Sequence, residues 1–323
     1  MDLSFENLIG NEEKQNNKIE NVIILGAGPA GLSAALYAAR AELSPFVLTG
    51  MTLGGQAALT NAIENYPGFP DGVGGSELGE LFQKQAERFG ARFEFDVVTE
   101  VDLISSPYVI KTYGQEFRTK TLIISTGANP NYLYVPGEKE LTGKGVSYCG
   151  TCDGWFFKGK KIVVVGGGDS ALEEGIFLTR FATSVTIIHR RDQLRASKIL
   201  QSRAMENERI SFIWDTVVKE IRGEESVESV LLENVKSGET SVMETDGVFI
   251  FIGNSPNTEI FKEFLDMDAE GFLIVDANMH TNKPGVFAAG EVMDPHYKQV
   301  VISAGMGAAA AIEATRYLEG LEE

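Results

Sequence analysis

The sequence predicts an α/β protein of two domains, and three observations lead to this prediction. The chain has 323 residues, more than the roughly 250–300 at which a single hydrophobic core stops growing. An apolar run, a glycine-rich turn and an Ala- and Leu-rich stretch follow one another near the N-terminus, and the same succession returns 140 residues later, from Gly26 to Gly166. Apolar residues make up 43% of the chain, which is enough to form real cores.

The first succession begins with the short apolar run Val22–Leu25, which is typical of a buried parallel strand. Gly26, Gly28 and Gly31 follow with the spacing GxGxxG, and Leu32–Arg40 has the composition of a helix. A strand, a glycine turn and a helix are the context in which this spacing binds a dinucleotide. The first glycine permits the tight turn, the second lets a pyrophosphate approach the backbone, and the third lets the helix pack on the strand.

The second succession repeats this pattern. A strand is expected at Lys161–Val165 and a helix at Leu172–Arg180. Between them, the sequence GGGDSA places Gly166, Gly168 and Ala171 at the spacing GxGxxA. Two dinucleotide sites in one chain imply two dinucleotide ligands.

A basic stretch follows the next expected strand, Ser184–Ile188. Where NAD-binding proteins place an acid, this chain has His189, Arg190 and Arg191, and then Arg195. An arginine at this place suits a 2′-phosphate, so the second site is predicted to bind NADPH. The alternative is a solvated basic patch, which the net charge of -18 makes harder to explain.

The first site lacks the acid that holds the ribose in NAD-binding proteins. Its following strand ends at residues 48–50, where the sequence is Leu-Thr-Gly. We therefore expect a different dinucleotide there, and FAD fits because a flavin mediates between a hydride donor and a disulfide.

The two cysteines, Cys149 and Cys152, form a CxxC motif. Such a pair lowers a thiol pKa and closes a small, reducible disulfide. A zinc site is the weaker interpretation, because zinc needs four ligands and none of the three histidines has finger-like spacing to the pair. No metal is therefore expected.

The residues after the pair leave two questions open. Asp153 is a plausible proton donor or acceptor when the pair opens, although an Asp before Gly154 is also typical of a turn. Trp155–Phe157 could belong to the core or form an exposed docking patch for a protein.

The net charge and the lack of targeting features in the sequence limit the binding partners and the cellular location that we expect. A net charge of -18 disfavours nucleic acid and anionic membranes. No stretch approaches the about 18 apolar residues that cross a bilayer. Residues 1–20 are polar and acidic, without the features of a signal or transit peptide. We expect them to form a surface arm on a cytoplasmic protein.

The ordered set of motifs resembles the low-molecular-weight thioredoxin reductases, from about residue 21 to about residue 321. The matching segments are ILGAGPAG, GGQ, ENYPGFP, TGA, VSYCGTCDG, VVVGGGDSALEE, HRRDQLR, FIGNSPNT, GVFAAGEV and YKQVVISAG. The resemblance implies two Rossmann-like dinucleotide-binding domains, each with three layers in the arrangement ββα. Residues 21–130 and 257–323 would form a split FAD domain, with the NADPH domain, residues 131–256, inserted and carrying the CxxC motif.

The resemblance also implies residue roles. Cys152 would lie next to the flavin, Cys149 would attack the substrate disulfide, and Asp153 would be the catalytic acid. The implied FAD residues are Gly26, Gly28, Pro29, Ala30, Gly31, Gly55, Gln56, Asn65, Thr126, Gly127, Gly290 and Glu291 at the ribityl chain, and Gln299 and Val300 near the isoalloxazine. The implied NADPH residues are Gly166, Gly168, Asp169, Ser170, Ala171, His189, Arg190, Arg191 and Arg195. Four residues depart from the usual family pattern: Ser125, Glu291, Lys298 and Val300.

Thioredoxin or a thioredoxin-like protein is the implied substrate, and the chain is expected to form a homodimer. The alternatives are a ferredoxin-dependent or small-molecule dithiol flavoprotein of the same family, which the intact HRRDQLR segment disfavours. A non-enzymatic redox sensor is a further alternative, which a reactive thiol pair beside a cofactor site disfavours.

Overall fold

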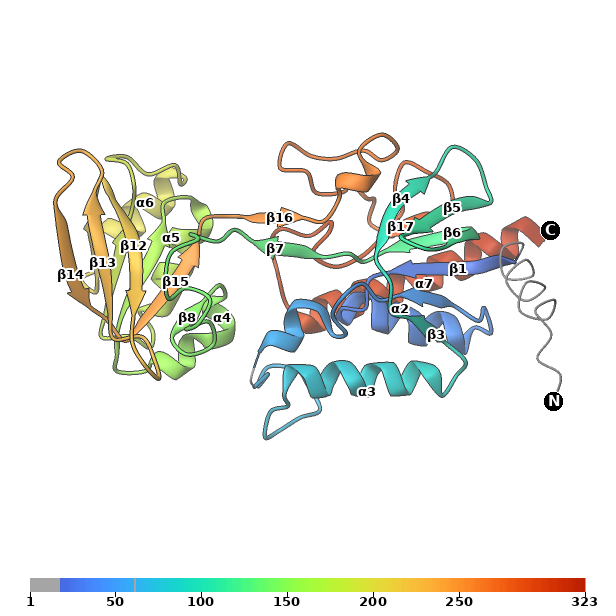
Figure 1. Ribbon diagram of the computed structural model, residues 1–323, viewed down its shortest axis with the longest axis horizontal. Coiled ribbons are helices and arrows are strands. Elements are labelled where there is room, and N and C mark those ends of the chain that lie inside the picture. The colour runs from blue at the N-terminus through green and yellow to red at the C-terminus, as the bar shows by residue number, and fades with distance from the viewer. Residues whose placement is uncertain (1–17, 61, 323) are drawn as a thin grey trace. The chain divides into compact units, whose positions relative to one another are not determined.

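The computed structural model describes residues 18–60 and 62–322, and these form two compact units (Figure 1). Unit 1 contains the described residues up to Asn129 and those from Ser255 onward, and unit 2 is Pro130–Asn254. Most of the expected arm, residues 1–17, lies outside the described residues. Its expected end at residue 20 is wrong, because β1 already begins at Ile19.

Unit 1 is built on a sheet of seven strands. Their sheet order is β3 (Arg92–Glu94), β2 (Phe46–Leu48), β1 (Ile19–Leu25), β6 (Glu116–Ile124), β5 (Tyr108–Thr112) and β4 (Val98–Asp102), with β17 (Val286–Ala288) also beside β6. β6 pairs antiparallel with β5 along its first half and parallel with β17 along its second half. Val101 and Ile110 of the β4–β5 hairpin pack in one buried cluster with side chains of β1 and β2, so the hairpin covers one face of the parallel strands.

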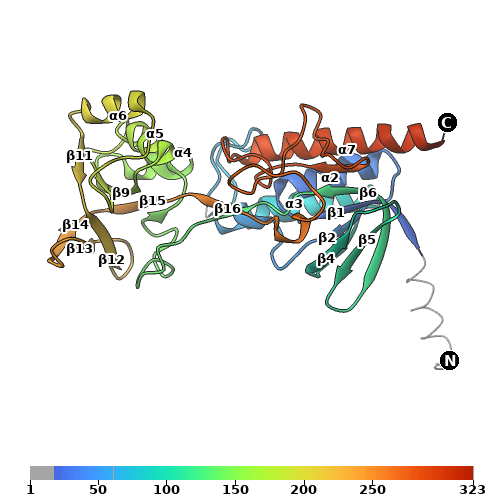
Figure 2. The ribbon, with the colours of Figure 1, turned by 90° about the horizontal axis from the view of Figure 1, so that it is seen from above.

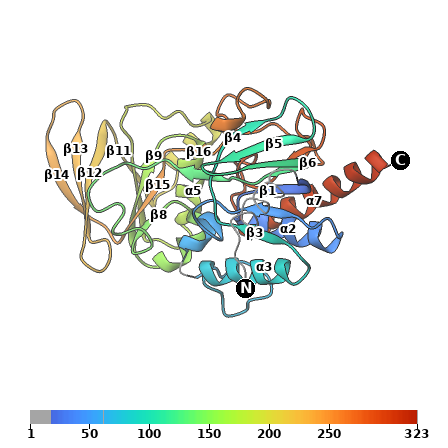
Figure 3. The same ribbon diagram turned by 45° about the vertical axis from the view of Figure 1, so that its right-hand side comes forward.

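Helices cover the other face of the parallel strands. They are α2 (Pro29–Arg40), α3 (Gly75–Glu87) and α7 (Val300–Glu322), and α2 and α3 are seen side by side in Figure 3. The core between α2, α7 and the sheet consists largely of alanines. These small side chains let the two helices approach closely, and a Cβ added to Gly307 would lie 1.9 Å from the Ala30 carbonyl oxygen. Short 3-10 turns, η1 (Gly55–Leu59) and η3 (Glu259–Phe261), complete the unit.

Unit 2 has three layers, which Figure 2 shows in side view. The middle layer is a parallel sheet in the order β11 (Ile210–Ile213), β10 (Ser184–Ile188), β9 (Lys161–Gly166), β15 (Gly247–Phe251) and β8 (Val146–Ser147). One face carries the antiparallel strands β12 (Thr216–Arg222), β13 (Ser229–Asn234) and β14 (Thr240–Glu244). The other carries α4 (Gly150–Asp153), η2 (Gly154–Phe157), α5 (Asp169–Leu178) and α6 (Lys198–Met205). A separate apolar core fills each interlayer space.

The predicted fold class is confirmed: both units are Rossmann-like, and unit 2 is inserted into the sequence of unit 1. The chain passes between them at β7 (Ala128–Pro130) and β16 (Asn254–Pro256), which pair with each other. The strand expected at Ser184–Ile188 has those bounds. The helix expected at Leu172–Arg180 begins earlier, at Asp169, because the glycine motif itself supplies its first turn.

Candidate functional site

The first glycine turn joins β1 to α2, and its three glycines meet different surroundings. Gly26 has a φ of +100°, and a Cβ added there would lie 2.4 Å from the Ser125 carbonyl oxygen. A Cβ added to Gly31 would lie 1.9 Å from the Gly26 carbonyl oxygen. A Cβ added to Gly28 would find no heavy atom within 4 Å. Close packing thus requires glycine at positions 26 and 31. Gly28 instead leaves the backbone open to a ligand, at a helix start that has no side-chain cap.

Residues from distant parts of unit 1 meet at this turn. A Cβ on Gly55 would lie 3.1 Å from the Gly28 Cα atom, and a Cβ on Gly290 would lie 2.9 Å from the Ala30 Cβ atom. The structure therefore brings together these four predicted cofactor residues. Pro29 is the first residue of α2, where its missing N–H costs no hydrogen bond.

A second group of predicted residues makes hydrogen bonds with two asparagines. Gln56 Nε2 donates to Asn129 Oδ1 at 2.7 Å, and Thr126 Oγ1 donates to the Asn257 carbonyl oxygen at 2.8 Å. The Asn257 N–H donates to the Gly127 carbonyl oxygen at 3.0 Å. These contacts fix the loop after β6.

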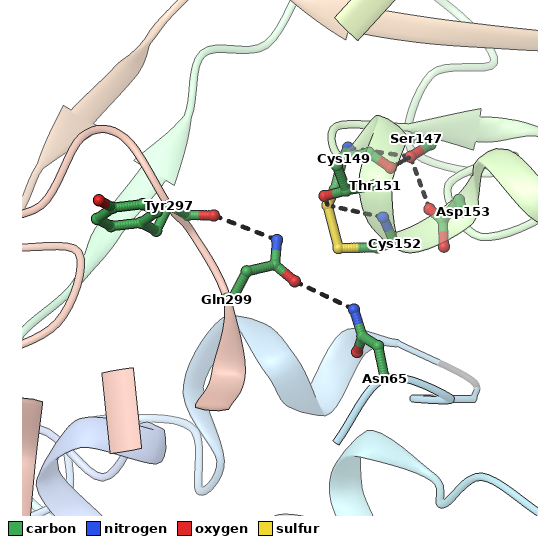
Figure 4. Close-up of a disulfide and its surroundings, with 8 residues drawn as sticks. All are labelled: Asn65, Ser147, Cys149, Thr151, Cys152, Asp153, Tyr297 and Gln299. Carbon is green, nitrogen blue, oxygen red and sulfur yellow. Dashed lines mark hydrogen bonds between the residues drawn. A yellow bond between two sulfur atoms is a disulfide. The ribbon is translucent and has the colours of Figure 1, made fainter. Parts of the chain in front are cut away.

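The residues just before α7 form a third group. Asn65 Nδ2 donates to Gln299 Oε1 at 3.1 Å, and Gln299 Nε2 donates to the Tyr297 carbonyl oxygen at 3.2 Å (Figure 4). Burial raises the pKa of the nearby Glu291 carboxyl, and the Lys298 charge opposes this effect. Val300 packs in a separate apolar cluster around η1 and the start of α3.

The second glycine turn, between β9 and α5, repeats the geometry of the first. Gly166 has a φ of +153°, and a Cβ added there would lie 2.4 Å from the Phe251 carbonyl oxygen and 2.7 Å from the Ala171 methyl group. A Cβ added to Gly168 would find no heavy atom within 4 Å. Gly168 is also the N-cap of α5 and provides no side-chain cap. The open middle position therefore recurs where the sequence predicted a second pyrophosphate site.

The loop after β10 is attached to this turn. The Gly167 carbonyl oxygen accepts hydrogen bonds from the Arg195 and Ala196 N–H groups, at 2.8 and 3.2 Å. The buried His189 ring lies against the turn, since a Cβ on Gly167 would stand 2.3 Å from it. Burial lowers the pKa of His189, and its Nε2 lies 3.1 Å from the Gln193 carbonyl oxygen. His189 thus supports the turn from within the fold.

The basic side chains of this loop are exposed: Arg190, Arg191 and Arg195. Asp169, at the start of α5, accepts a hydrogen bond from the Ser197 N–H at 2.7 Å. Its carboxylate is therefore tied to the start of α6. Ser170 is exposed at the same helix start.

The two cysteines lie where β8 ends and α4 begins, and they form a disulfide with a Cα–Cα distance of 5.3 Å (Figure 4). Cys149 is the N-cap of α4, and its Sγ atom accepts a hydrogen bond from the Cys152 N–H at 3.2 Å. The Cys149 N–H donates to Ser147 Oγ at 3.1 Å. The Cys152 side is more exposed than the Cys149 side.

The Asp153 carboxyl is held close to this pair. Ser147 Oγ donates to Asp153 Oδ2 at 2.6 Å. Burial raises the pKa of Asp153, and the Ser147 hydrogen bond opposes the rise. The same hydroxyl therefore contacts both the Cys149 backbone and the acid, which places a proton-holding group beside the thiols.

The chain is similar to known proteins over almost its whole length. The sequence profile of the pyridine nucleotide-disulphide oxidoreductases matches residues 20–307. The chain belongs to this family. A thioredoxin reductase of Streptomyces coelicolor is 50% identical over 308 residues, 94% of this chain and 96% of that protein. A thioredoxin reductase of Coxiella burnetii is 46% identical over 94% of this chain and 98% of its own. The crystal structure of thioredoxin reductase from Streptococcus pyogenes has a TM-score of 0.90 at 44% identity, covering 94% of this chain and 99% of that one.

The resemblance predicted from the motifs is thus confirmed, and this pyridine nucleotide-disulphide oxidoreductase is an enzyme of the thioredoxin reductase type. Within residues 18–60 and 62–322, we find no helix with the length and apolar character needed to span a membrane.

Sequence reasoning missed three residues that organise the oxidoreductase. Ser147 links the acid to the redox pair, as described above. Glu138 holds the loop after β7 by accepting hydrogen bonds from the Leu133 and Tyr134 N–H groups. Ser125 was noted only as a departure from the family pattern, yet its Oγ lies 2.8 Å from the Leu25 carbonyl oxygen and 3.1 Å from that of Gly26. No spacing pattern marks Ser147 or Glu138, because their hydrogen-bond partners lie at irregular separations of two to ten residues along the chain.

Proposed function

We propose that the enzyme transfers electrons from NADPH, through FAD and the Cys149–Cys152 pair, to the disulfide of thioredoxin or a thioredoxin-like protein. Unit 1 would bind FAD, and unit 2 would bind NADPH. The observation that carries the proposal is the repeated turn whose middle glycine, Gly28 or Gly168, faces open space, together with a disulfide in the inserted unit.

The residues of unit 1 fit a bound FAD. The open backbone at Gly28 and the uncapped start of α2 suit a pyrophosphate. Gly55 and Gly290, which border the same turn, would contact the cofactor, and Glu291 would hold the ribityl chain. Asn65 and Gln299, already hydrogen-bonded to each other, would lie near the isoalloxazine. A bound flavin would supply two-electron chemistry between a nicotinamide and a disulfide.

The residues of unit 2 fit NADPH. Gly168 and the start of α5 would bind the pyrophosphate, and the exposed Arg190, Arg191 and Arg195 would bind the 2′-phosphate. His189 would act indirectly, by supporting the Gly167 backbone. The charge of this loop, rather than the glycine turn, would then distinguish NADPH from NADH.

The two thiols would divide the disulfide chemistry. The Cys149 thiolate would attack a sulfur of the substrate disulfide, and one substrate thiolate would leave. Cys152 would then attack the mixed disulfide, re-forming the Cys149–Cys152 bond and releasing the second substrate thiol. Asp153 would supply a proton to a departing thiolate, and its raised pKa suits this role.

The aromatic run after the pair would contribute to substrate docking. Trp155 and Phe156 are 56% and 45% exposed, whereas Phe157 is buried in the core. Lys158 lies over the Trp155 ring, at 4.9 Å from its centroid. Exposed aromatic side chains beside a reactive pair are typical of a protein-binding surface. We further propose a homodimer acting in the cytoplasm.

The direct test is reduction of an oxidised bacterial thioredoxin by the purified protein with NADPH or NADH. We expect the protein to be yellow, to consume one NADPH per disulfide reduced, and to have a far higher KM for NADH. A colourless protein that does not bind added FAD would refute the flavin assignment. Stopped-flow absorbance would separate flavin reduction from the later thiol steps.

A further inference from the structure

Tyr134 has an unusual backbone conformation and is strongly exposed. Its φ is +57°, in the left-handed region that a bulky side chain rarely adopts. Its side chain is nevertheless 87% exposed, so packing of the ring does not explain the conformation. Strain of this kind persists where the surroundings impose it, and it is often found at functional surfaces.

The surroundings that impose this conformation are centred on Glu138. This carboxylate is 4% exposed, and it accepts hydrogen bonds from the backbone N–H groups of Leu133 at 2.9 Å and Tyr134 at 2.7 Å. It also accepts one from the Tyr148 hydroxyl at 2.9 Å. Burial, and then the Glu138 charge, raise the pKa of Tyr148, so its hydroxyl remains a donor. The loop that presents Tyr134 is therefore fixed before any partner binds.

Three tyrosine rings extend from the redox pair to this loop. The Tyr148 ring makes an edge contact with the Tyr132 ring at 5.4 Å between centroids, and Tyr132 makes a similar contact with Tyr134 at 5.8 Å. Tyr148 immediately precedes Cys149 in the sequence. We call Tyr132, Tyr134 and Tyr148 the tyrosine ladder.

We propose that the tyrosine ladder is a docking surface for the protein that carries the substrate disulfide, with Tyr134 as its main contact. The proposal rests on the function proposed above and adds a surface that selects the partner. Preorganised tyrosines bind proteins well, because they bury large amphipathic surfaces and lose little side-chain entropy.

The position of the tyrosine ladder points to the disulfide-carrying protein as its partner, because the ladder is continuous with the redox pair. A substrate disulfide must come within bonding distance of Cys149 Sγ to be attacked. The surface of the substrate protein around that disulfide must then cover the residues next to Cys149. Tyr148 is the neighbour on the N-terminal side, and its ring contacts extend the covered surface to Tyr134. A small-molecule disulfide would not reach that far.

The test substitutes Tyr134 with asparagine, which tolerates the left-handed conformation. In Tyr134→Asn we expect the KM for an oxidised bacterial thioredoxin to rise about tenfold, equivalent to about 1.4 kcal/mol. The kcat should stay within about twofold, as expected for a lost binding contact. Flavin reduction by NADPH should be unchanged, and the melting temperature should not fall. Tyr134→Phe, which keeps the ring, should retain most of the affinity.

Tyr113 provides a matched control, because it is 85% exposed and lies in unit 1. Tyr113→Asn should leave the KM for thioredoxin unchanged. An unchanged KM in Tyr134→Asn, or an equal rise in both variants, would overturn the docking proposal while leaving the proposed function intact. A change in sedimentation instead of KM would assign the surface to a second copy of the chain. If the unaltered protein reduces no thioredoxin, the function itself fails.

Discussion

The substitution Gly168→Ala should weaken nucleotide binding without impairing folding, so it tests the two effects separately. Gly168 has an extended backbone, with φ −94° and ψ −176°, which alanine adopts without strain. An added Cβ would meet no heavy atom within 4 Å. Gly168→Ala should therefore fold normally or gain about 0.4–1 kcal/mol, because alanine restricts the unfolded chain. Its methyl group would nevertheless stand where we place the pyrophosphate.

The expected magnitude follows from the hydrogen bonds at risk. A hydrogen bond from a backbone N–H to a charged phosphate contributes about 1.5–3 kcal/mol, so losing one should raise the KM about 10- to 100-fold. NADPH and NADH should be affected alike, since both contain the pyrophosphate. Gly166→Ala, in contrast, should impair folding. Its φ of +153° and the contact at 2.4 Å should cost about 2–6 kcal/mol of folding stability.

The assay combines steady-state kinetics with each nucleotide and urea unfolding of each variant. Gly114→Ala is the matched control, because a Cβ there also meets open space and the residue lies in unit 1. It should leave the KM for both nucleotides unchanged, and its stability should stay the same or rise by about 0.4–1 kcal/mol, as for Gly168→Ala. The reasoning is refuted if Gly168→Ala binds NADPH as the unaltered enzyme does, or if it is destabilised as much as Gly166→Ala.

Four other variants test the remaining roles. Replacing Arg190 and Arg191 by Ala should raise the KM for NADPH strongly, by about 1.5–3 kcal/mol per contact, and the KM for NADH little; equal effects would contradict the assignment. Cys149→Ser and Cys152→Ser should both abolish thioredoxin reduction. Only Cys152→Ser should trap a mixed disulfide with a thioredoxin that lacks its resolving cysteine, and trapping by Cys149→Ser would reverse the two roles. Asp153→Asn should slow the thiol steps about 10²- to 10⁴-fold and leave flavin reduction by NADPH near normal. Because burial raises the pKa of Asp153, the folded state holds this proton to higher pH than the unfolded chain. Stability is therefore lost as pH rises from the ordinary pKa of 3.8 through the folded value. The Asn variant should accordingly be stabilised at pH 7 but not at pH 3 in urea unfolding, and the same gain at both would refute this account.

The sequence was sufficient for the fold because the decisive signals are local. β10 was predicted with its observed bounds, since its five residues are flanked by a turn and a basic loop. The different roles of Gly26, Gly28 and Gly31 also follow from spacing alone, because a strand-to-helix turn fixes which glycine faces which neighbour. Short apolar runs and glycine spacing carry this information without knowledge of the tertiary structure.

The contacts around the redox pair could not be predicted in this way. Ser147 and Asp153 meet because a short helix folds back on the end of β8, and no periodic pattern marks such a contact. The sequence left Trp155–Phe157 open between core and docking surface. The structure divides the run, with Phe157 buried at 7% exposure and the two preceding aromatics exposed. Phe157 is buried because its ring packs against β15, at 4.9 Å from the Phe249 ring centroid, and the sequence of the run does not reveal this contact.

Helix α5 connects the proposed NADPH turn to the thiols. Gly168 caps its start, and farther along it packs against the segment of the redox pair. A Cβ added to Gly150 would lie 2.2 Å from Glu174 Oε2, and one added to Gly154 would lie 3.0 Å from Leu178 Cδ2. Such close contacts do not permit the helix and the pair to move independently. Substitutions on this face of α5 should therefore alter nucleotide binding and thiol reactivity together, whereas substitutions in the exposed arginine loop should alter binding alone.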